Sequence, residues 1–315
     1  MSVLVTGGSG MIASRIVRDL AREGKKVVVN DLQMDEAVLG YVLTEEDRKN
    51  IVFVQGNILD YEDLLKTCQD NNVDEIIHTA SMMGNASQPR LATHVNTGGM
   101  INILEIARIL NVKKVVYTST NSVFPAAEKG TIKNDARFAP DTIYGCTKCF
   151  NEYAAEFYHK KFGLDITGIR VSALVFGPLQ RRGVSGSITI ETLQKPAIGQ
   201  VGHCPYNDDC GTWAYADDVA RAHVMALSVK RTEGMAGSYN LGGTAITFKE
   251  MAEYTKSLIP DAKVEFEDNQ LAQYYWNVDT TLIEKEIGYK PKWNIYDAFK
   301  ETINASRKEA GLEPV

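Results

Sequence analysis

Short runs rich in β-branched residues alternate with helical patterns along the first half of the chain, and this alternation constrains the fold most. The runs cover residues 3–6, 26–29, 51–54, 75–78 and 114–118, and the patterns between them place apolar residues three to five positions apart. Such runs are typical of strands buried on both faces, in a parallel sheet with helices on either side. With right-handed crossovers, the alternation predicts an α/β fold with a doubly wound parallel sheet.

The first predicted strand runs directly into a glycine-rich turn, Thr6-Gly-Gly-Ser-Gly-Met-Ile-Ala13, which precedes an amphipathic helix. Gly7 and Gly10 allow the tight turn and let backbone N–H groups approach a pyrophosphate at the positive end of that helix, as in the Rossmann fold. The second strand leads to Asp31, whose carboxylate would accept hydrogen bonds from both hydroxyls of an adenosine ribose. Asp31 would repel a 2′-phosphate and no arginine follows it closely, so the expected cofactor is NAD. Asn57, after the third strand, is a candidate to bind the adenine edge or, equally, a simple turn residue.

The regular alternation weakens after residue 178. Residues 179–209 are rich in glycine and proline, and they predict loops with one helix near 187–193. We therefore predict an NAD-binding Rossmann domain over 1–178, its sheet completed by about 210–242, and a small C-terminal α/β substrate lobe over 179–209 and 243–315. Ligands of such sheets bind beyond the carboxyl ends of the strands, so the lobe is expected to close over a substrate.

Tyr144 and Lys148 stand four residues apart, so on a helix they share one face. A free phenol, with a pKa of about 10, is a poor base at neutral pH, but an adjacent ammonium favours the phenolate and is expected to lower that pKa. A hydroxyl of Thr120 or Ser119, at the end of the fifth strand, can bind the same substrate oxygen while Tyr144 exchanges a proton with it. A nicotinamide would exchange a hydride with the carbon that carries this oxygen, which predicts an oxidoreductase.

Composition excludes several other classes of protein. The net charge is −6 and no run of five Lys or Arg occurs, which disfavours nucleic acid as a partner. No apolar run reaches the roughly 18 residues of a membrane span, and the first residues lack a secretory signal, so a cytoplasmic location is expected. The five cysteines are an odd, scattered set that predicts reduced thiols. A four-thiolate metal site, with Cys146 and Cys149 joined by Cys204 and Cys210, is the less favoured alternative, and we expect no metal.

These residues resemble the extended short-chain dehydrogenase/reductases, also called the NAD-dependent epimerase/dehydratase family. The resemblance spans nearly the whole chain and includes the turn at 6–13, the His78-Thr-Ala80 and Val95-Asn96 segments, and Tyr239-Asn-Leu-Gly242. It implies catalytic roles for Thr120, Tyr144 and Lys148, with Ser119 beside them. The coenzyme contacts that it implies are Gly7, Gly10, Met11, Ile12, Asp31, Asn57, Ile58, Thr79, Ala80, Tyr144 and Lys148. It also implies a homodimer packed through the helix after Asn96 and the helix that carries Tyr144.

Departures from the family motifs bear on the substrate. Sugar-nucleotide 4,6-dehydratases carry an Asp-Glu pair directly after the catalytic threonine, where this chain has Asn121 and Ser122, which disfavours dehydration. Sugar-nucleotide epimerases typically hold the diphosphate with the asparagine of R-x-x-N-x-Y-G-P and with an arginine near the Val-Asp-Asp motif. Residues 170–178 lack that asparagine, and 211–215 stand where the arginine is expected. A diphosphate without cationic partners binds poorly, although Arg181 and Arg182 offer nearby cations.

Other stretches, over 119–124, 140–148 and 247–252, are similar to the short-chain L-threonine dehydrogenases. The candidate substrate residues are Ser81, Met82, Thr120, Ser122, Leu174 and Trp213. The apolar members of this set fit ordinary core packing equally well. Our leading hypothesis is an NAD-dependent oxidoreductase that transfers hydride between NAD and a small secondary alcohol or ketone. The alternatives are an NAD-dependent sugar-nucleotide epimerase and a redox sensor that binds dinucleotide without turnover.

Overall fold

The computed structural model describes residues 1–83, 88–125, 130–180, 183–207, 209–269 and 277–315. The chain divides into two compact units, each built from three stretches of sequence. The first unit comprises Met1–Val171, Ala220–Leu241 and Asp279–Tyr289. The second comprises Ser172–Val219, Gly242–Val278 and Lys290–Val315.

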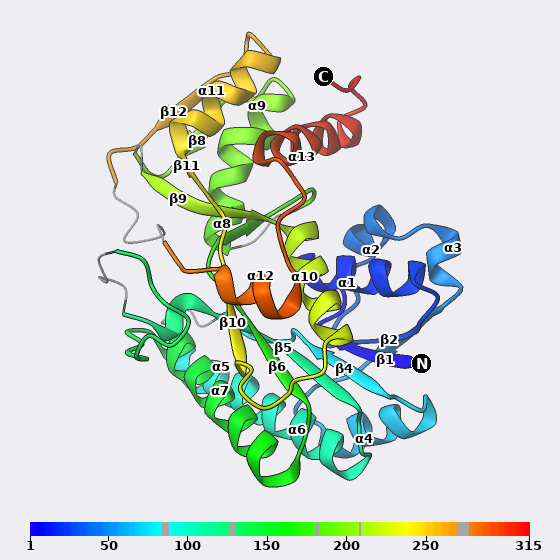
Figure 1. Ribbon diagram of the computed structural model, residues 1–315. Helices are drawn as coiled ribbons and strands as arrows, with labels where there is room; N and C mark the ends of the chain where they lie inside the picture. The colour runs from blue at the N-terminus through cyan, green and yellow to red at the C-terminus, as the bar shows by residue number, and fades with distance from the viewer. Residues whose placement is uncertain (84–87, 126–129, 181–182, 208, 270–276) are drawn as a thin grey trace. The chain divides into compact units, whose positions relative to one another are not determined.

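The first unit is built on a seven-stranded sheet with the order β10-β6-β5-β4-β1-β2-β3 (Figure 1). Its strands in chain order are β1 (Ser2–Thr6), β2 (Lys26–Asp31), β3 (Ile51–Gln55), β4 (Glu75–His78), β5 (Lys114–Thr120), β6 (Ile166–Val171) and β10 (Ser238–Leu241). Every neighbouring pair is parallel, so the predicted doubly wound parallel sheet is confirmed. The strand order reverses between β1 and β4, and sheets of this kind bind ligands at the carboxyl ends of the strands beside such a reversal.

Helices cover both faces of this sheet, which explains the continuous apolar runs of its strands. Figure 1 shows α4 (Tyr61–Asp70), α6 (Gly99–Ile109) and α7 (Ile143–Phe162) on one face, with α1 (Met11–Arg22), α10 (Ala216–Ser228) and α12 (Thr281–Ile287) on the other. The shorter elements of this unit are α2 (Glu36–Val42), α3 (Glu45–Arg48), α5 (Pro89–Thr93), the π-helical turn η1 (His94–Gly98) and the 3₁₀ turn η2 (Asn121–Val123). The core against α4, α6 and α7 includes Leu4, Ile76, Ile103 and Ile166, none of them more than 1% exposed.

The second unit has its own sheets and core. A three-stranded sheet has the order β11-β9-β7, and β12 pairs with β8. The elements of this unit are β7 (Leu174–Phe176), α8 (Gly183–Thr189), the π-helical turn η3 (Ile190–Gln194), α9 (Lys195–Ala197), β8 (Gly202–Cys204), β9 (Cys210–Tyr215), β11 (Thr244–Thr247), α11 (Phe248–Leu258), β12 (Val264–Phe266) and α13 (Ile295–Glu309). Its core is aromatic, with Phe176, Trp213, Phe248 and Phe299 fully buried. In neither unit do the described residues form a helix that is long and apolar enough to cross a membrane.

The observed division differs from the predicted one in two places. Residues 210–215 form β9, which pairs with β7 and β11 in the second unit, whereas we expected them to return to the central sheet. Only β10 completes that sheet, beside β6. Helix α12, assigned from the sequence to the substrate lobe, belongs to the first unit, where Glu286 accepts hydrogen bonds from the Ala236 N–H and the Tyr239 hydroxyl. Partners so distant in sequence leave no mark in local periodicity.

Candidate active site

The glycine-rich turn lies between β1 and α1 and has the backbone that a dinucleotide needs. Gly7 has a φ of 67°, and a β-carbon there would lie 2.9 Å from the Ala80 Cα, so only glycine fits without strain. Gly10 caps α1 without a side-chain hydrogen bond, and the first turn carries no acidic residue. Because the first N–H groups of a helix lack partners within it, the half-buried Met11 and Ile12 present their amides and a positive helix end to a diphosphate. The turn therefore fits the predicted coenzyme.

Asp31, at the end of β2, is oriented by the same turn. Its Oδ2 accepts hydrogen bonds from the Ser9 N–H at 3.0 Å and from the Ser9 hydroxyl at 2.6 Å. Asp31 is half-buried, so its carboxylate is held in one direction and is still accessible to a ribose. We did not identify Ser9 from the sequence, although its hydroxyl in the middle of the turn was the available signal.

Two residues expected at the adenine end have different surroundings. Asn57 is exposed, and its Oδ1 accepts from the Leu59 N–H at 3.0 Å, which is the turn role that we had kept open for it. Ile58 is buried and packs on Gly99 of α6. A β-carbon added to Gly99 would overlap the Ile58 side chain. The Ile58 side chain therefore belongs to the core, and only its backbone is suited to a coenzyme contact.

The segment after β4 lies against the glycine turn. The Thr79 hydroxyl donates to the Thr6 carbonyl at 2.7 Å, and the Ala80 N–H donates to the Thr6 hydroxyl at 3.4 Å. The Thr6 hydroxyl and the His78 Nδ1 lie 2.8 Å apart. Burial, with a smaller effect of the Lys148 charge, lowers the pKa of His78 to about 3. His78 is therefore neutral at physiological pH.

Helix α7 carries the predicted proton-transfer pair. It begins after Thr142, whose hydroxyl accepts from the Gly145 N–H at 3.0 Å, so Tyr144 lies in its first turn. One turn later, Lys148 is 2% exposed, its Nζ donates to the Thr118 carbonyl at 2.9 Å, and it lies 5.5 Å from the centroid of the Tyr144 ring. The structure thus brings Tyr144 and Lys148 together beside the carboxyl-terminal part of β5.

The pKa values of this pair correct one expectation. Burial raises the pKa of Tyr144 to about 12, against the lowering effect of a hydrogen bond with Ser81, whereas we expected Lys148 to lower it. Burial also lowers the pKa of Lys148 to about 8, and the charge of Glu152 opposes that shift. Desolvation dominates both groups because Lys148 is buried and Tyr144 is half-buried.

The two candidate hydroxyls at the end of β5 have different partners. The Thr120 Oγ1 accepts from the Ser122 N–H at 3.2 Å and lies 3.3 Å from the Ser122 Oγ, so Thr120 and Ser122 share one hydroxyl cluster. The Ser119 hydroxyl instead donates to Glu152 Oε1 at 2.6 Å, and Ser119 is 1% exposed. We therefore correct the expectation for Ser119 and leave it out of the substrate-binding set.

Buried polar contacts support this region from behind. Asn96, in the π-helical turn η1, binds both the N–H and the carbonyl of Met82 and also donates to the Thr147 hydroxyl. These contacts fix the backbone of half-buried Met82 next to exposed Ser81. Gly145 lies so close to the Ser122 carbonyl oxygen that a β-carbon would overlap it. We did not single out this packing role of Gly145 from the sequence.

Two apolar substrate candidates are core residues of the second unit. Trp213 is fully buried, its Nε1 donates to the Ile246 carbonyl at 3.3 Å, and its ring packs edge-on against Phe176 and Phe248. Leu174, 7% exposed, belongs to the same cluster. The core-packing interpretation therefore replaces the pocket interpretation for both. Among the residues that the structure describes, no group of three or more His, Cys, Asp or Glu could hold a metal ion.

The fold and the site define the class of protein. A parallel sheet with a strand-order reversal, a glycine turn at the start of α1 and an oriented carboxylate after β2 are the features of a dinucleotide-binding Rossmann enzyme.

The chain belongs to the NAD dependent epimerase/dehydratase family, whose model matches residues 3–242. The predicted family, the NAD dependence and the enzymatic class are thereby confirmed. The chain is 29% identical to a UDP-glucuronate 4-epimerase of Thermodesulfobacterium geofontis, over 98% of this chain and 97% of that protein. It is 21% identical to the mitochondrial L-threonine 3-dehydrogenase of Bos taurus, over 98% of this chain and 83% of that protein. The solved UDP-glucose 4-epimerase of Thermotoga maritima superposes with a TM-score of 0.85 at 25% identity, covering 98% of this chain and 100% of the other.

Proposed function

We propose that this protein catalyses reversible hydride transfer between NAD and a secondary alcohol or ketone, with Tyr144 as the general acid and base. One observation carries the proposal. The Tyr144 hydroxyl hydrogen-bonds the Ser81 hydroxyl, and its ring lies next to the buried ammonium of Lys148. A phenol in this position can exchange a proton with a substrate oxygen that Ser81 and its neighbours bind.

The residues of the first unit take distinct roles in this proposal. Gly7, Gly10 and the first turn of α1 would hold the diphosphate of NAD, and Asp31 would accept hydrogen bonds from the adenosine ribose. Bound there, the coenzyme would supply the acceptor for the hydride of the carbinol carbon. Tyr144 takes the proton of the substrate hydroxyl during oxidation and returns it during reduction, while the hydroxyls of Thr120 and Ser122 bind the same oxygen. The charged form of Lys148 favours the phenolate and contributes to coenzyme binding.

A dehydrogenase is favoured over an epimerase by the residues at two diphosphate positions. Ala173, three residues after Arg170, replaces the asparagine of the epimerase motif. Arg170 itself is 6% exposed and is bound to Glu152, so its guanidinium is committed inside the first unit. In the 211–215 stretch, Trp213 is core. Arg181 and Arg182, the alternative cations, lie outside the described residues.

A sugar-nucleotide epimerase is the second candidate, favoured by the identity to the UDP-glucuronate 4-epimerase over nearly the whole chain. In such a reaction the same tyrosine and coenzyme would oxidise one carbon of the sugar, and the hydride would return to its opposite face. Both candidates use the same residues of the first unit and differ in whether NADH leaves the protein.

The experiment that separates the candidates measures both substrates on the same preparation. We expect NADH absorbance to rise when the protein is incubated with NAD and a secondary alcohol, with L-threonine as the first of a panel, and we expect no tight binding of UDP in calorimetry. Tight UDP binding with interconversion of a UDP-sugar and no NADH release would overturn the dehydrogenase in favour of the epimerase. Binding of NAD without turnover of either class would favour the redox sensor.

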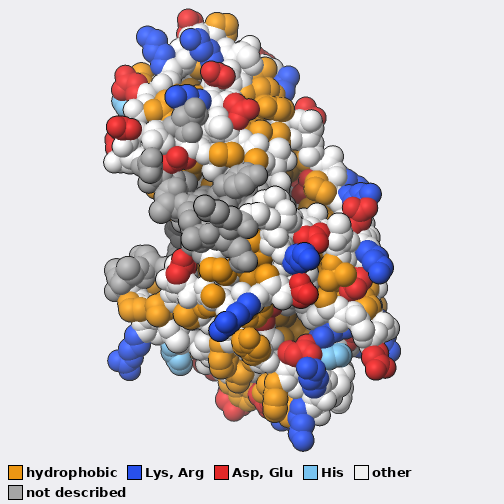
Figure 2. Space-filling view, turned by 60° about the vertical axis from the view of Figure 1, so that its left-hand side comes forward, with side chains coloured by type: hydrophobic (Ala, Val, Ile, Leu, Met, Phe, Trp, Pro, Cys, Tyr) orange, Lys and Arg blue, Asp and Glu red, His pale blue; other side chains and the backbone are white. Residues whose placement is uncertain are grey.

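We further propose that the protein forms a homodimer through α5, α6 and α7. Large apolar side chains are exposed on these helices, at Leu91, Ile109, Ile143, Phe150, Tyr153, Phe157 and Phe162. Figure 2 shows hydrophobic side chains gathered on the face of the first unit that turns these helices toward the viewer. A cluster of exposed apolar side chains of this kind is typical of a protein–protein interface. The cytoplasmic location stays a prediction from the sequence.

A further inference from the structure

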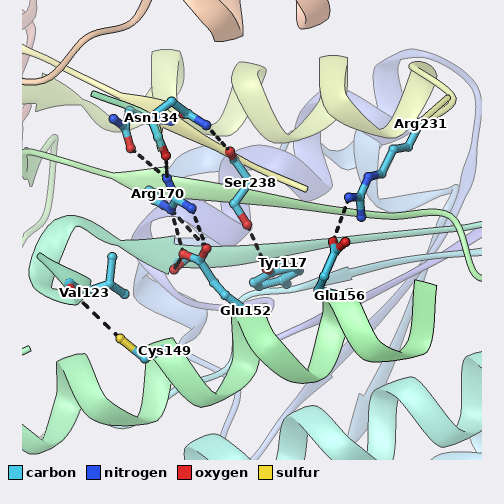
Figure 3. Close-up of polar contacts among 11 residues, drawn as sticks. Tyr117, Val123, Asn134, Cys149, Glu152, Glu156, Arg170, Arg231 and Ser238 are labelled. Atoms are coloured by element: carbon cyan, nitrogen blue, oxygen red, sulfur yellow. Dashed lines mark hydrogen bonds and ion pairs between the residues drawn. The ribbon is translucent and has the colours of Figure 1, made fainter. Parts of the chain in front are cut away.

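A buried carboxylate on α7 connects the helix of the proton-transfer pair to the strand of the catalytic threonine. Glu152 is 7% exposed and accepts hydrogen bonds from the Ser119 hydroxyl at 2.6 Å and from Arg170, whose Nε and Nη2 lie 2.8 and 2.7 Å from its two oxygens. Figure 3 shows this carboxylate pointing from α7 toward Arg170 on β6. The contact is bidentate, which is the strongest geometry for an arginine–carboxylate pair.

Arg170 is held from its other sides as well. Its Nη1 donates to the Asn134 carbonyl at 2.7 Å, and its guanidinium carbon lies 5.4 and 5.2 Å from the ring centroids of Phe124 and Phe138. Asn134 in turn binds the backbone of β10, since its Nδ2 donates to the Ser238 carbonyl and its Oδ1 accepts from the Asn240 N–H (Figure 3). The pair joins α7 to β6 and has partners on β5 (Ser119), on β10, where Asn240 Oδ1 accepts from Arg170 Nη1 at 3.3 Å, and in the segment before α7, so its geometry is strongly constrained.

Glu152 lies at the right place in the chain to act on both parts of the site. It follows Lys148 by four residues, so the two side chains share one face of α7. Its partner Ser119 directly precedes Thr120 on β5, and Thr118, one residue before, accepts the hydrogen bond from Lys148 through its carbonyl. A single carboxylate therefore contacts the strand that carries Thr120 and faces the ammonium beside Tyr144.

We propose that Glu152 is a positioning residue for the reaction, which holds the end of β5 through Ser119 and keeps Lys148 charged through its own negative charge. This inference rests on the proposed function of Tyr144 and Lys148. Burial lowers the pKa of Lys148, and the charge of Glu152 opposes that shift. Among the residues that the structure describes, Tyr144 and His78 also interact with Lys148, and His78 is neutral at physiological pH. Without the carboxylate, Lys148 would lose its proton at a lower pH.

The test compares Glu152→Gln with Glu156→Gln, a matched change one turn further along α7. Glu156 is also paired with a buried arginine, since its Oε2 lies 2.7 Å from Arg231 Nη2 (Figure 3). NADH affinity, measured by fluorescence over a series of pH values, should fall at high pH in the native protein as Lys148 loses its proton. We expect Glu152→Gln to move this loss of NADH affinity to lower pH by about one unit. We also expect kcat to change by a larger factor than the KM for NAD. Glu156→Gln should change neither.

The variant Ser119→Ala separates the two parts of the proposal. It keeps the Glu152–Arg170 ion pair and removes only the contact with β5. We expect kcat to fall about tenfold, as for a small displacement of Thr120, with the pH dependence of NADH binding unchanged. An unchanged kcat for Ser119→Ala would overturn the role of Glu152 in holding β5.

An unchanged pH dependence of NADH binding in Glu152→Gln would overturn the electrostatic role. If Glu152→Gln does not fold, the double variant Glu152→Gln with Arg170→Met carries the same test, because it leaves no unpaired buried charge. NADH binding needs no substrate, so this readout decides on Glu152 even if the protein turns over neither alcohols nor UDP-sugars. Failure to turn over either class would instead count against the proposed function.

Discussion

Asp31 is the residue that should decide between NAD and NADP. Replacing Asp31 with Ala removes a charged acceptor of ribose hydrogen bonds and the repulsion of a 2′-phosphate. We expect the ratio of kcat/KM for NAD to that for NADP to fall at least about tenfold, because a hydrogen bond to a charged group contributes roughly 1.5–3 kcal/mol. Asp35→Ala is the control, since Asp35 is an acidic residue nearby that caps α2 through the Val38 N–H. Equal use of both coenzymes by the native protein would contradict the role of Asp31.

Tyr144 is the residue whose replacement should slow hydride transfer and leave the binding of NAD intact. Tyr144→Phe keeps the ring beside Lys148 and removes the hydroxyl that bonds Ser81. We expect turnover to fall by about 10²–10⁴, the usual effect of losing a general acid or base, while calorimetry finds an unchanged NAD affinity. Retained turnover on the best substrate would exclude Tyr144 from proton transfer.

His78 should make the fold sensitive to acid. Its pKa is lowered from 6.5 to about 3 in the folded state, so below pH 6.5 the unfolded chain takes up a proton that the folded protein excludes. The free energy of unfolding should therefore decrease as the pH falls from 6.5 toward 3, with a limiting slope of about 1.4 kcal/mol per pH unit from this group.

Urea unfolding at several pH values checks this expectation. In His78→Gln the slope should be smaller by the contribution of about one proton, since the glutamine takes up no proton in either state. An identical slope in the native protein and in His78→Gln would show that His78 does not titrate as expected.

At the scale of elements, the start of α7 packs directly against the turn that follows β5, where Gly145 contacts the Ser122 carbonyl. Gly145→Ala would place a β-carbon on the Ser122 carbonyl oxygen, so α7 or the turn must move. We expect turnover to fall about 100-fold, because a displacement of roughly 1 Å between Tyr144 and Thr120 has an effect of that size. Gly40→Ala, also within a helix but with nothing within 4 Å of the new β-carbon, should leave activity unchanged and add about 0.5–1 kcal/mol of stability. Equal activities of the two variants would show that close packing of α7 against this turn does not position Tyr144.

The strands were the elements most readily predicted. Each of the five predicted runs lies within an observed strand, with ends that agree to within two residues. Buried strands and amphipathic helices are specified by local patterns of apolar residues, which explains this agreement. The placement of residues 210–215 in the central sheet was wrong, because local periodicity does not say which sheet a strand joins. In the structure β9 pairs with β7 and β11, and its Trp213 packs against Phe176 and Phe248 of the second unit.

For the whole molecule, the apolar surface of α5–α7 predicts a dimer that one charge can disrupt. Phe157 on α7 is 57% exposed, and Phe157→Glu would place a carboxylate in the proposed interface. We expect sedimentation velocity to report a dimer for the native protein and a monomer for this variant. Leu312→Glu, an exposed apolar position in the second unit, should leave the dimer intact. A native monomer would remove the proposed interface.

The sequence by itself determined the class of fold, the glycine turn with Asp31, and the spacing of Tyr144 and Lys148, because each depends on a local pattern or on spacing along one element. The tertiary structure decided which side chains near the site are available. Ser119 is bound to Glu152, 33 residues away, and Arg170 is bound to Asn240, 70 residues away. Trp213, proposed from the sequence as a substrate residue, lies in the buried core because its packing partners Phe176 and Phe248 are distant in sequence. Hydrogen-bond partners and packing neighbours are chosen by the folded arrangement, and a local sequence pattern carries no record of them.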